Sequence, residues 1–190
     1  MDLFRAVPKQ QLQPGARIYR LPGRRLPGNI PYPVDNLWEF TRPPTLPSRR
    51  HAVYASTSPE LALKNASAVK GEADAYVACR IEFHTRPPMV QLSVPDAREH
   101  SDVGHLQKLI NERLRQWAGA QVPVKQPLAA LFLPGVAKHE LLIAMEASVL
   151  LADLVAEAAA KVGLWQAAPV ADGELFFEIA EDNFYVLQPL

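Results

Sequence analysis

Apolar and polar residues alternate with a period of two over several short segments of this chain. The clearest segment covers residues 75–83, where Val77, Cys79, Ile81 and Phe83 share one face. This alternation predicts a strand that buries Cys79. Similar but shorter patterns predict further strands at residues 17–21, 52–56, 89–94, 128–133, 140–143, 174–180 and 184–187.

Three other segments have the period or composition of a helix. Residues 58–70 start with Ser-Pro-Glu, a sequence that caps a helix, fixes its first backbone angle and complements its dipole. Apolar residues recur at helical spacing over residues 106–117, and residues 145–162 are rich in alanine and leucine up to Gly163. Because strands and helices are distributed together along the chain, the pattern predicts the α+β class.

Prolines and aromatic residues mark the N-terminal part of the chain. Nine of the eighteen prolines lie in residues 1–50, which excludes a long helix or a central strand there. Residues 23–47 are nevertheless rich in aromatic side chains, Trp38 among them, and a disordered linker has no need of these. We therefore expect an ordered loop with a short helical turn. Residues 1–190 are long enough to bury one core and are expected to form a single domain.

Charge is unevenly distributed, although the formal net charge is zero. Residues 1–50 contain nine Lys and Arg residues against three Asp and Glu residues, so the remainder is correspondingly acidic. This asymmetry is typical of a cleft with one phosphate-binding wall and one carboxylate-bearing wall. It is equally typical of two complementary surfaces that neutralise each other within one fold.

Several classes of protein are disfavoured by what the sequence lacks. No apolar run reaches the roughly 20 residues of a membrane span, and no basic and apolar leader opens the chain. The lone Cys79 fits a reducing compartment, so we expect a cytoplasmic location in the producing cell. The histidines lack the spacing of a metal site, no glycine-rich dinucleotide fingerprint is present, and no strong nucleic-acid signal is visible.

Two short motifs carry the candidate chemistry. In residues 17–21, Arg20 falls on the same strand face as Ile18. If Ile18 faces the core, Arg20 needs a partner, and the oxygens of a phosphate group match its guanidinium. Otherwise, Arg20 lies on the surface of an edge strand. The second motif is Ser-Thr-Ser at residues 56–58, which is either a hydroxyl cluster beside a cleft or a helix cap with ordinary turn residues.

The two motifs in their full form are Arg17-Ile18-Tyr19-Arg20 and Tyr54-Ala55-Ser56-Thr57-Ser58. Together they resemble the first two motifs of the ADP-ribosyltransferase toxin-like superfamily. The resemblance implies a split mixed or antiparallel sheet with flanking helices and NAD as the substrate bound across it. It also implies that Arg20 contacts the NAD phosphate and that Ser56 orders Arg20 and the catalytic acid. The other residues that it assigns to the NAD site are Tyr54, Thr57, Ser58 and Trp38.

The third motif of that superfamily is a Glu/Gln-x-Glu pair that supplies the catalytic carboxylate, and no such pair exists here. The carboxylate has to stabilise an oxocarbenium-like state when the glycosidic bond of NAD breaks. Two residues are candidates. Glu178 lies on the polar face of the predicted strand at 174–180, and Glu140 begins the predicted strand at 140–143 with Lys138 where the first acid would be. We prefer Glu178.

The resemblance implies a bacterial toxin or effector that cleaves NAD and transfers ADP-ribose to a macromolecular acceptor, without a metal. The missing Glu/Gln-x-Glu pair leaves that acceptor open. Such a protein would be accompanied by an antitoxin, immunity protein or chaperone, or be delivered to a target cell by a route without a classical signal peptide. One alternative is an NAD hydrolase of the RES toxin type, which residues 53–62 also resemble. Another is a catalytically inactive module that binds a partner through residues 23–47.

Overall fold

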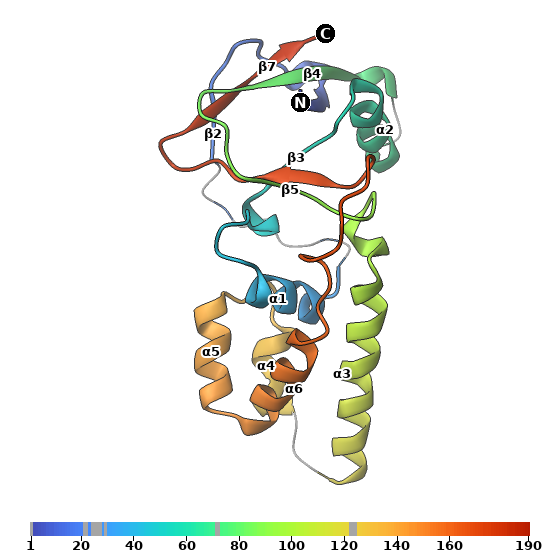
Figure 1. Cartoon of the computed structure of the whole chain (residues 1–190), viewed down its shortest axis with the longest axis vertical. Helices are drawn as coiled ribbons and strands as arrows, with labels where there is room; N and C mark the ends of the chain where they lie inside the picture. Colours follow the sequence, from blue (N-terminus) through green and yellow to red (C-terminus); the bar gives the residue numbers. More distant parts are fainter. Residues whose placement is uncertain (1, 21–22, 24–27, 29, 71–72, 122–124) are drawn as a thin grey trace. The chain divides into compact units, whose positions relative to one another are not determined.

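The computed structural model describes residues 2–20, 23, 28, 30–70, 73–121 and 125–190. Over these residues the chain has the predicted α+β fold (Figure 1). It divides into two compact units. The first unit combines Met1–Gly23, Thr45–Pro95 and Pro169–Leu190, and the second combines Arg24–Pro44 and Asp96–Ala168. A single domain over residues 1–190 stays a prediction.

The first unit contains the described strands and one long helix. Its elements in chain order are β1 (Phe4–Pro8), η1 (Lys9–Gln11), β2 (Ile18–Tyr19), η2 (Arg49–His51), β3 (Val53–Ala55), α2 (Pro59–Lys70), η3 (Ala73–Ala75), β4 (Tyr76–Phe83), β5 (Met89–Gln91), β6 (Leu175–Phe177) and β7 (Phe184–Pro189).

Among the described residues, these strands form two antiparallel sheets. The larger sheet has the order β1-β4-β7-β2 and the smaller has the order β3-β6-β5 (Figure 1). In the smaller sheet Tyr54 lies opposite Phe176, which in turn lies opposite Val90. A single bridge between Phe4 and Ser56 joins the edges of the two sheets. The predicted split and antiparallel pairing of the sheet are thus present.

The core of the first unit consists of apolar side chains from both sheets. Cys79 is fully buried in it, as the strand pattern predicted, and Ile18 packs against it from β2. Helix α2 packs against β1 and β4. The buried members of this core are Leu3, Ala55, Cys79, Ile81, Leu175, Phe177, Ile179, Tyr185 and Leu187.

The second unit is helical in the residues described. Its elements are α1 (Tyr32–Thr41), η4 (Ala97–Glu99), α3 (Ser101–Gly119), α4 (Lys125–Phe132), α5 (Lys138–Glu146) and α6 (Val149–Ala159). Helix α1 occupies the middle of the loop expected at 23–47 and is longer than the short helical turn expected there; it begins after Pro31 and has a proline in its first turn, where no main-chain N–H is needed. Helix α3 includes the predicted helix at 106–117.

Two of the predicted strands are wrong. Residues 128–133 lie mainly in helix α4, and residues 140–143 lie in helix α5. A short apolar run does not by itself distinguish a strand from a buried helix. In α4 the fully buried residues are Leu128 and Leu131, which are three apart and therefore on one helical face.

Other predicted boundaries also change. The long helix expected at 145–162 is two helices: α5 ends at Glu146, and Ser148 caps α6 by accepting a hydrogen bond from the Leu151 N–H (3.2 Å). Strand β1 was not predicted; it is short and ends in Pro8, so its alternation is weak. Leu21, at the end of the predicted first strand, lies outside the described residues. Within the residues that the structure describes, no helix is long and apolar enough to cross a membrane.

Candidate functional site

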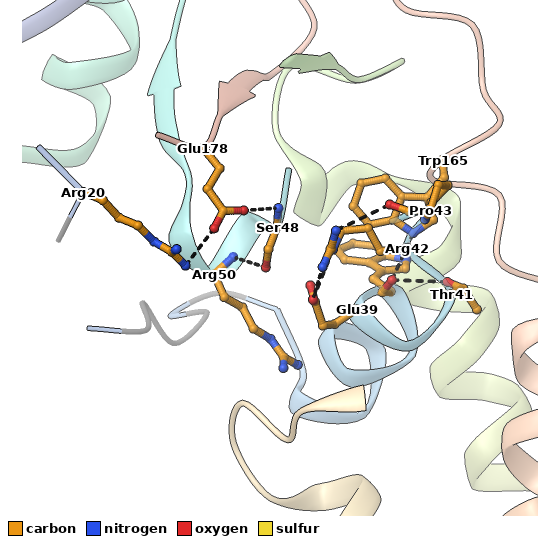
Figure 2. Close-up of polar contacts among 10 residues, drawn as sticks. Arg20, Glu39, Thr41, Arg42, Pro43, Ser48, Arg50, Trp165 and Glu178 are labelled. Carbon is orange, nitrogen blue, oxygen red and sulfur yellow. Dashed lines mark hydrogen bonds and ion pairs between the residues drawn. The ribbon is translucent and has the colours of Figure 1, made fainter. Parts of the chain in front are cut away.

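An ion pair brings together the two residues that sequence reasoning placed at the centre of the site. Arg20 follows β2 directly, and Glu178 follows β6 directly. The Nη2 atom of Arg20 lies 2.9 Å from Oε1 of Glu178 (Figure 2). About a quarter of each side chain is exposed, 28% for Arg20 and 23% for Glu178, so the pair is accessible to a ligand.

The position of Arg20 follows from the strand pattern. Ile18 packs on the core of the first unit, as the alternation required, and Arg20 is partly buried on the same side of the chain. A partly buried guanidinium needs a partner. In this structure the partner is the carboxylate of Glu178, where sequence reasoning expected a phosphate.

Glu178 also follows its predicted pattern. The apolar neighbours Leu175, Phe177 and Ile179 all lie in the core, and Glu178 points to the other face of β6. Its second oxygen, Oε2, accepts a hydrogen bond from the main-chain N–H of Ser48 (3.0 Å). Each carboxylate oxygen therefore has a donor from a different segment of the chain (Figure 2).

A second arginine–carboxylate pair lies on the same face of β6. Glu174, Phe176 and Glu178 alternate along the strand and share this face. Arg49 pairs with Glu174 at 2.8 Å between Nη2 and Oε1, and its guanidinium lies 5.9 Å from the ring centre of Phe176. Tyr54 packs against Phe176 from β3. Two arginine–carboxylate pairs, Arg20–Glu178 and Arg49–Glu174, thus lie on the face of β6 that also carries the buried ring of Phe176.

The hydroxyl groups of residues 56–58 have local structural partners. Ser56 is buried, and its Oγ accepts a hydrogen bond from Asn65 at 3.5 Å. Thr57 donates to the main-chain carbonyl of Ala171 at 3.1 Å. The Oγ of Ser58 accepts from the Leu61 N–H at 3.2 Å, which makes it the cap of α2. The sequence allowed either a hydroxyl cluster beside a cleft or a helix cap with turn residues. The contacts of Thr57 and Ser58 are those of a turn and a helix cap.

Trp38 belongs to the second unit and lies in its interior. Its side chain is 1% exposed, and its indole N–H donates to Oδ2 of Asp102 at 2.9 Å. The main-chain carbonyl of Trp38 accepts a hydrogen bond from the indole of Trp165 at 3.0 Å. Trp38 therefore packs the helical unit, and its ring is not presented to a ligand.

Glu140 also lies in the second unit. It is exposed in the first turn of α5, and its Oε2 accepts a hydrogen bond from the Ala137 N–H at 2.7 Å. This contact is half of a capping box, because Ala137 has no hydroxyl group to complete it. The strand that was expected to carry Glu140 is absent, which leaves Glu178 as the better-placed acid.

Sequence reasoning missed two groups in the site. Glu174 is four residues before Glu178, and the alternation of β6 would have placed both carboxylates on one face. Ser48 contributes through its main-chain N–H, a group that nearly every residue type has, so its identity carries no signal for this contact. No cluster of three or more His, Cys, Asp or Glu side chains that could hold a metal occurs among the described residues.

The geometry allows two kinds of chemistry at one place. A guanidinium binds phosphate oxygens, and a carboxylate beside it stabilises positive charge on a sugar ring. Comparisons with family models, with curated proteins and with solved structures find no match to this chain.

Proposed function

We propose that this chain cleaves the nicotinamide glycosidic bond of NAD, with Glu178 as the catalytic carboxylate and Arg20 as the phosphate-binding cation. The observation that carries the proposal is the 2.9 Å contact between these two side chains. Arg20 and Glu178 were singled out from separate motifs near opposite ends of the chain. Their proximity places a cation for the phosphate of NAD next to a carboxylate for its ribose.

The reaction needs little from the protein besides positioning and charge. The bond between the anomeric carbon of ribose and the nicotinamide nitrogen breaks, and its electron pair stays on nicotinamide, which leaves as a neutral molecule. Positive charge then develops on the ribose ring, where the Glu178 carboxylate stabilises it. A nucleophile adds to the anomeric carbon and loses a proton.

The nucleophile is better assigned to water than to a protein or nucleic-acid group. In the superfamily that the motifs resemble, the residue two positions before the catalytic glutamate is Glu or Gln and goes with a defined acceptor. Here that residue is Phe176, which is fully buried. A buried phenyl ring cannot bind an acceptor, which favours NAD hydrolysis of the RES type over ADP-ribosyl transfer.

The experiment is an assay of nicotinamide release from NAD by the purified chain, with and without cell lysate. Release without lysate supports hydrolysis, and release that requires lysate and labels a macromolecule supports transfer. Glu178→Gln is expected to lower the rate at least about 100-fold, because it removes the charge that the transition state needs. Glu181→Gln is the matched control, since Glu181 is an exposed carboxylate in the same loop. Absence of both turnover and NAD binding would refute the proposal and leave a partner-binding module.

A further inference from the structure

The contacts of Glu178 come from two donors that differ in kind. Arg20 is a long side chain with several rotatable bonds, and it reaches Oε1. The Ser48 N–H is part of the main chain, and it reaches Oε2 at 3.0 Å. A main-chain donor in a fixed turn holds its direction at little entropic cost, whereas an arginine side chain does not.

The turn that carries Ser48 is itself well fixed. Ser48 caps η2: its Oγ accepts a hydrogen bond from the Arg50 N–H at 3.2 Å, and its carbonyl accepts from the His51 N–H at 3.2 Å. Ser48 is 3% exposed and has an extended backbone, with φ −77° and ψ 131°. The direction of its N–H toward Glu178 is therefore set by the local fold (Figure 2).

We propose that the Ser48 N–H positions the Glu178 carboxylate for reaction while Arg20 changes partner. This inference rests on the proposed function, in which the Arg20 guanidinium binds the pyrophosphate of NAD. Binding of that phosphate competes with the Arg20–Glu178 ion pair and frees Oε1 for the ribose. Oε2 stays hydrogen-bonded to Ser48, so the carboxylate keeps its orientation.

Ser48 thus has the task that the resemblance assigned to Ser56. The Oγ of Ser56 accepts a hydrogen bond from Asn65, and its main chain joins the two sheets at the bridge with Phe4. Ser48 is a positioning residue, because it acts through Glu178 and through its main chain.

Proline is the substitution that tests a main-chain donor. The φ of Ser48 lies in the range that proline adopts, so Ser48→Pro removes the N–H with little change of backbone angle. Ser48→Pro also removes the Oγ group that caps η2. Ser48→Ala removes this Oγ group and keeps the main-chain N–H. The difference between the two variants therefore reports on the N–H. Ser148→Ala is the matched control for loss of a serine cap, because Ser148 caps α6 in the second unit.

Ser48→Pro is expected to lower kcat for NAD cleavage roughly 10- to 100-fold, the usual worth of a hydrogen bond to a charged group. Its KM is expected to stay close to that of the wild type, because NAD binding depends on Arg20. Ser148→Ala is expected to keep kcat within a few-fold, and Ser48→Ala is expected to lose clearly less of kcat than Ser48→Pro, because it keeps the main-chain N–H. Wild-type kcat in Ser48→Pro, or an equal loss in Ser48→Ala, would overturn the inference.

NMR tests the contact between Ser48 and Glu178 independently of enzymatic activity and without a proline variant. The amide proton of Ser48, observed by NMR, is expected to move upfield in Glu178→Ala, because the hydrogen bond to the carboxylate is lost. Inorganic pyrophosphate added to the wild type is expected to shift the Arg20 side-chain signal and to leave the Ser48 amide in place. An unchanged chemical shift of the Ser48 amide proton in Glu178→Ala would refute the proposed hydrogen bond between Ser48 and Glu178. An upfield shift of this proton on addition of pyrophosphate would refute the proposal that the hydrogen bond persists when Arg20 changes partner. If the wild type does not cleave NAD, the proposed function fails and this measurement still decides the contact.

Discussion

At the scale of single residues, the informative position is that of a cation directly after a short strand, on the side of the chain that faces the core. Arg20 lies on the same side of the chain as Ile18, which packs against the core. A guanidinium in this partly buried position needs a polar or charged partner. Glu178 is that partner. Because the pair is partly exposed, it contributes only about 0–1 kcal/mol to the free energy of unfolding. A pair that adds so little to stability is suited to being exchanged for a ligand.

Arg20→Ala is therefore expected to abolish NAD binding and to change the free energy of unfolding by less than about 1 kcal/mol. Calorimetric titration with NAD and urea unfolding measure the two quantities. Arg80→Ala is the matched control, since Arg80 also forms an ion pair, with Glu82 at 2.8 Å, on β4 of the same unit. Full NAD binding by Arg20→Ala would show that the assignment of Arg20 is wrong.

Tyr185 makes the stability of the first unit sensitive to alkaline pH. Burial raises the pKa of its phenol, an effect that the nearby Arg5 partly opposes. The folded state then keeps a proton that the unfolded state loses above pH about 10. This contribution to stability is complete below pH 10 and is lost as the pH rises through the pKa of the folded state.

Tyr185→Phe tests this dependence, because phenylalanine has no proton to lose. Between pH 9 and pH 11, the free energy of unfolding of the wild type is expected to fall more steeply than that of Tyr185→Phe. Urea unfolding at a series of pH values gives both slopes, and the difference removes contributions from other groups. Parallel slopes would contradict the prediction.

At the scale of elements, the strands of the first unit were predicted better than the helices of the second. In β4 the alternation is clear over residues 79–83, where Cys79 and Ile81 are buried and Arg80 and Glu82 are exposed. Residues 128–133 and 140–143 are short apolar runs, which fit either type of element, and their helical form depends on packing within the second unit. In the candidate site, the placement of the Glu178 side chain follows from the alternation of residues 174–180, whereas the main-chain contact of Ser48 has no counterpart in the residue types of the sequence.

The cap of α5 yields a prediction that separates the two candidate acids. Glu140→Ala removes the hydrogen bond to the Ala137 N–H and is expected to lower stability by about 0.5–1 kcal/mol. Nicotinamide release is expected to continue at the wild-type rate, because the proposed catalytic acid is Glu178. Loss of release in a folded Glu140→Ala protein, judged by circular dichroism, would reverse the choice of acid.

At the scale of the whole molecule, two units are interleaved along one chain. Residues 24–44 and 96–168 form the second unit, and the segments before, between and after them form the first. The second unit has its own buried centre at Asp102, whose carboxylate accepts hydrogen bonds from the indole N–H of Trp38 and from the N–H groups of Gly163 and Leu164. Each unit therefore has stabilising interactions of its own, and a mutation can remove those of one unit without touching those of the other.

Asp102→Ala is expected to lower the free energy of unfolding by about 3 kcal/mol or more, because it leaves several buried donors without an acceptor. Asp153→Ala, at an exposed position of α6, is the control and is expected to change little. If the units unfold separately, hydrogen exchange in Asp102→Ala will accelerate in α3 and α6 and stay slow in β4 and β7. Faster exchange in the strands as well would mean that the interleaved units unfold as one cooperative body.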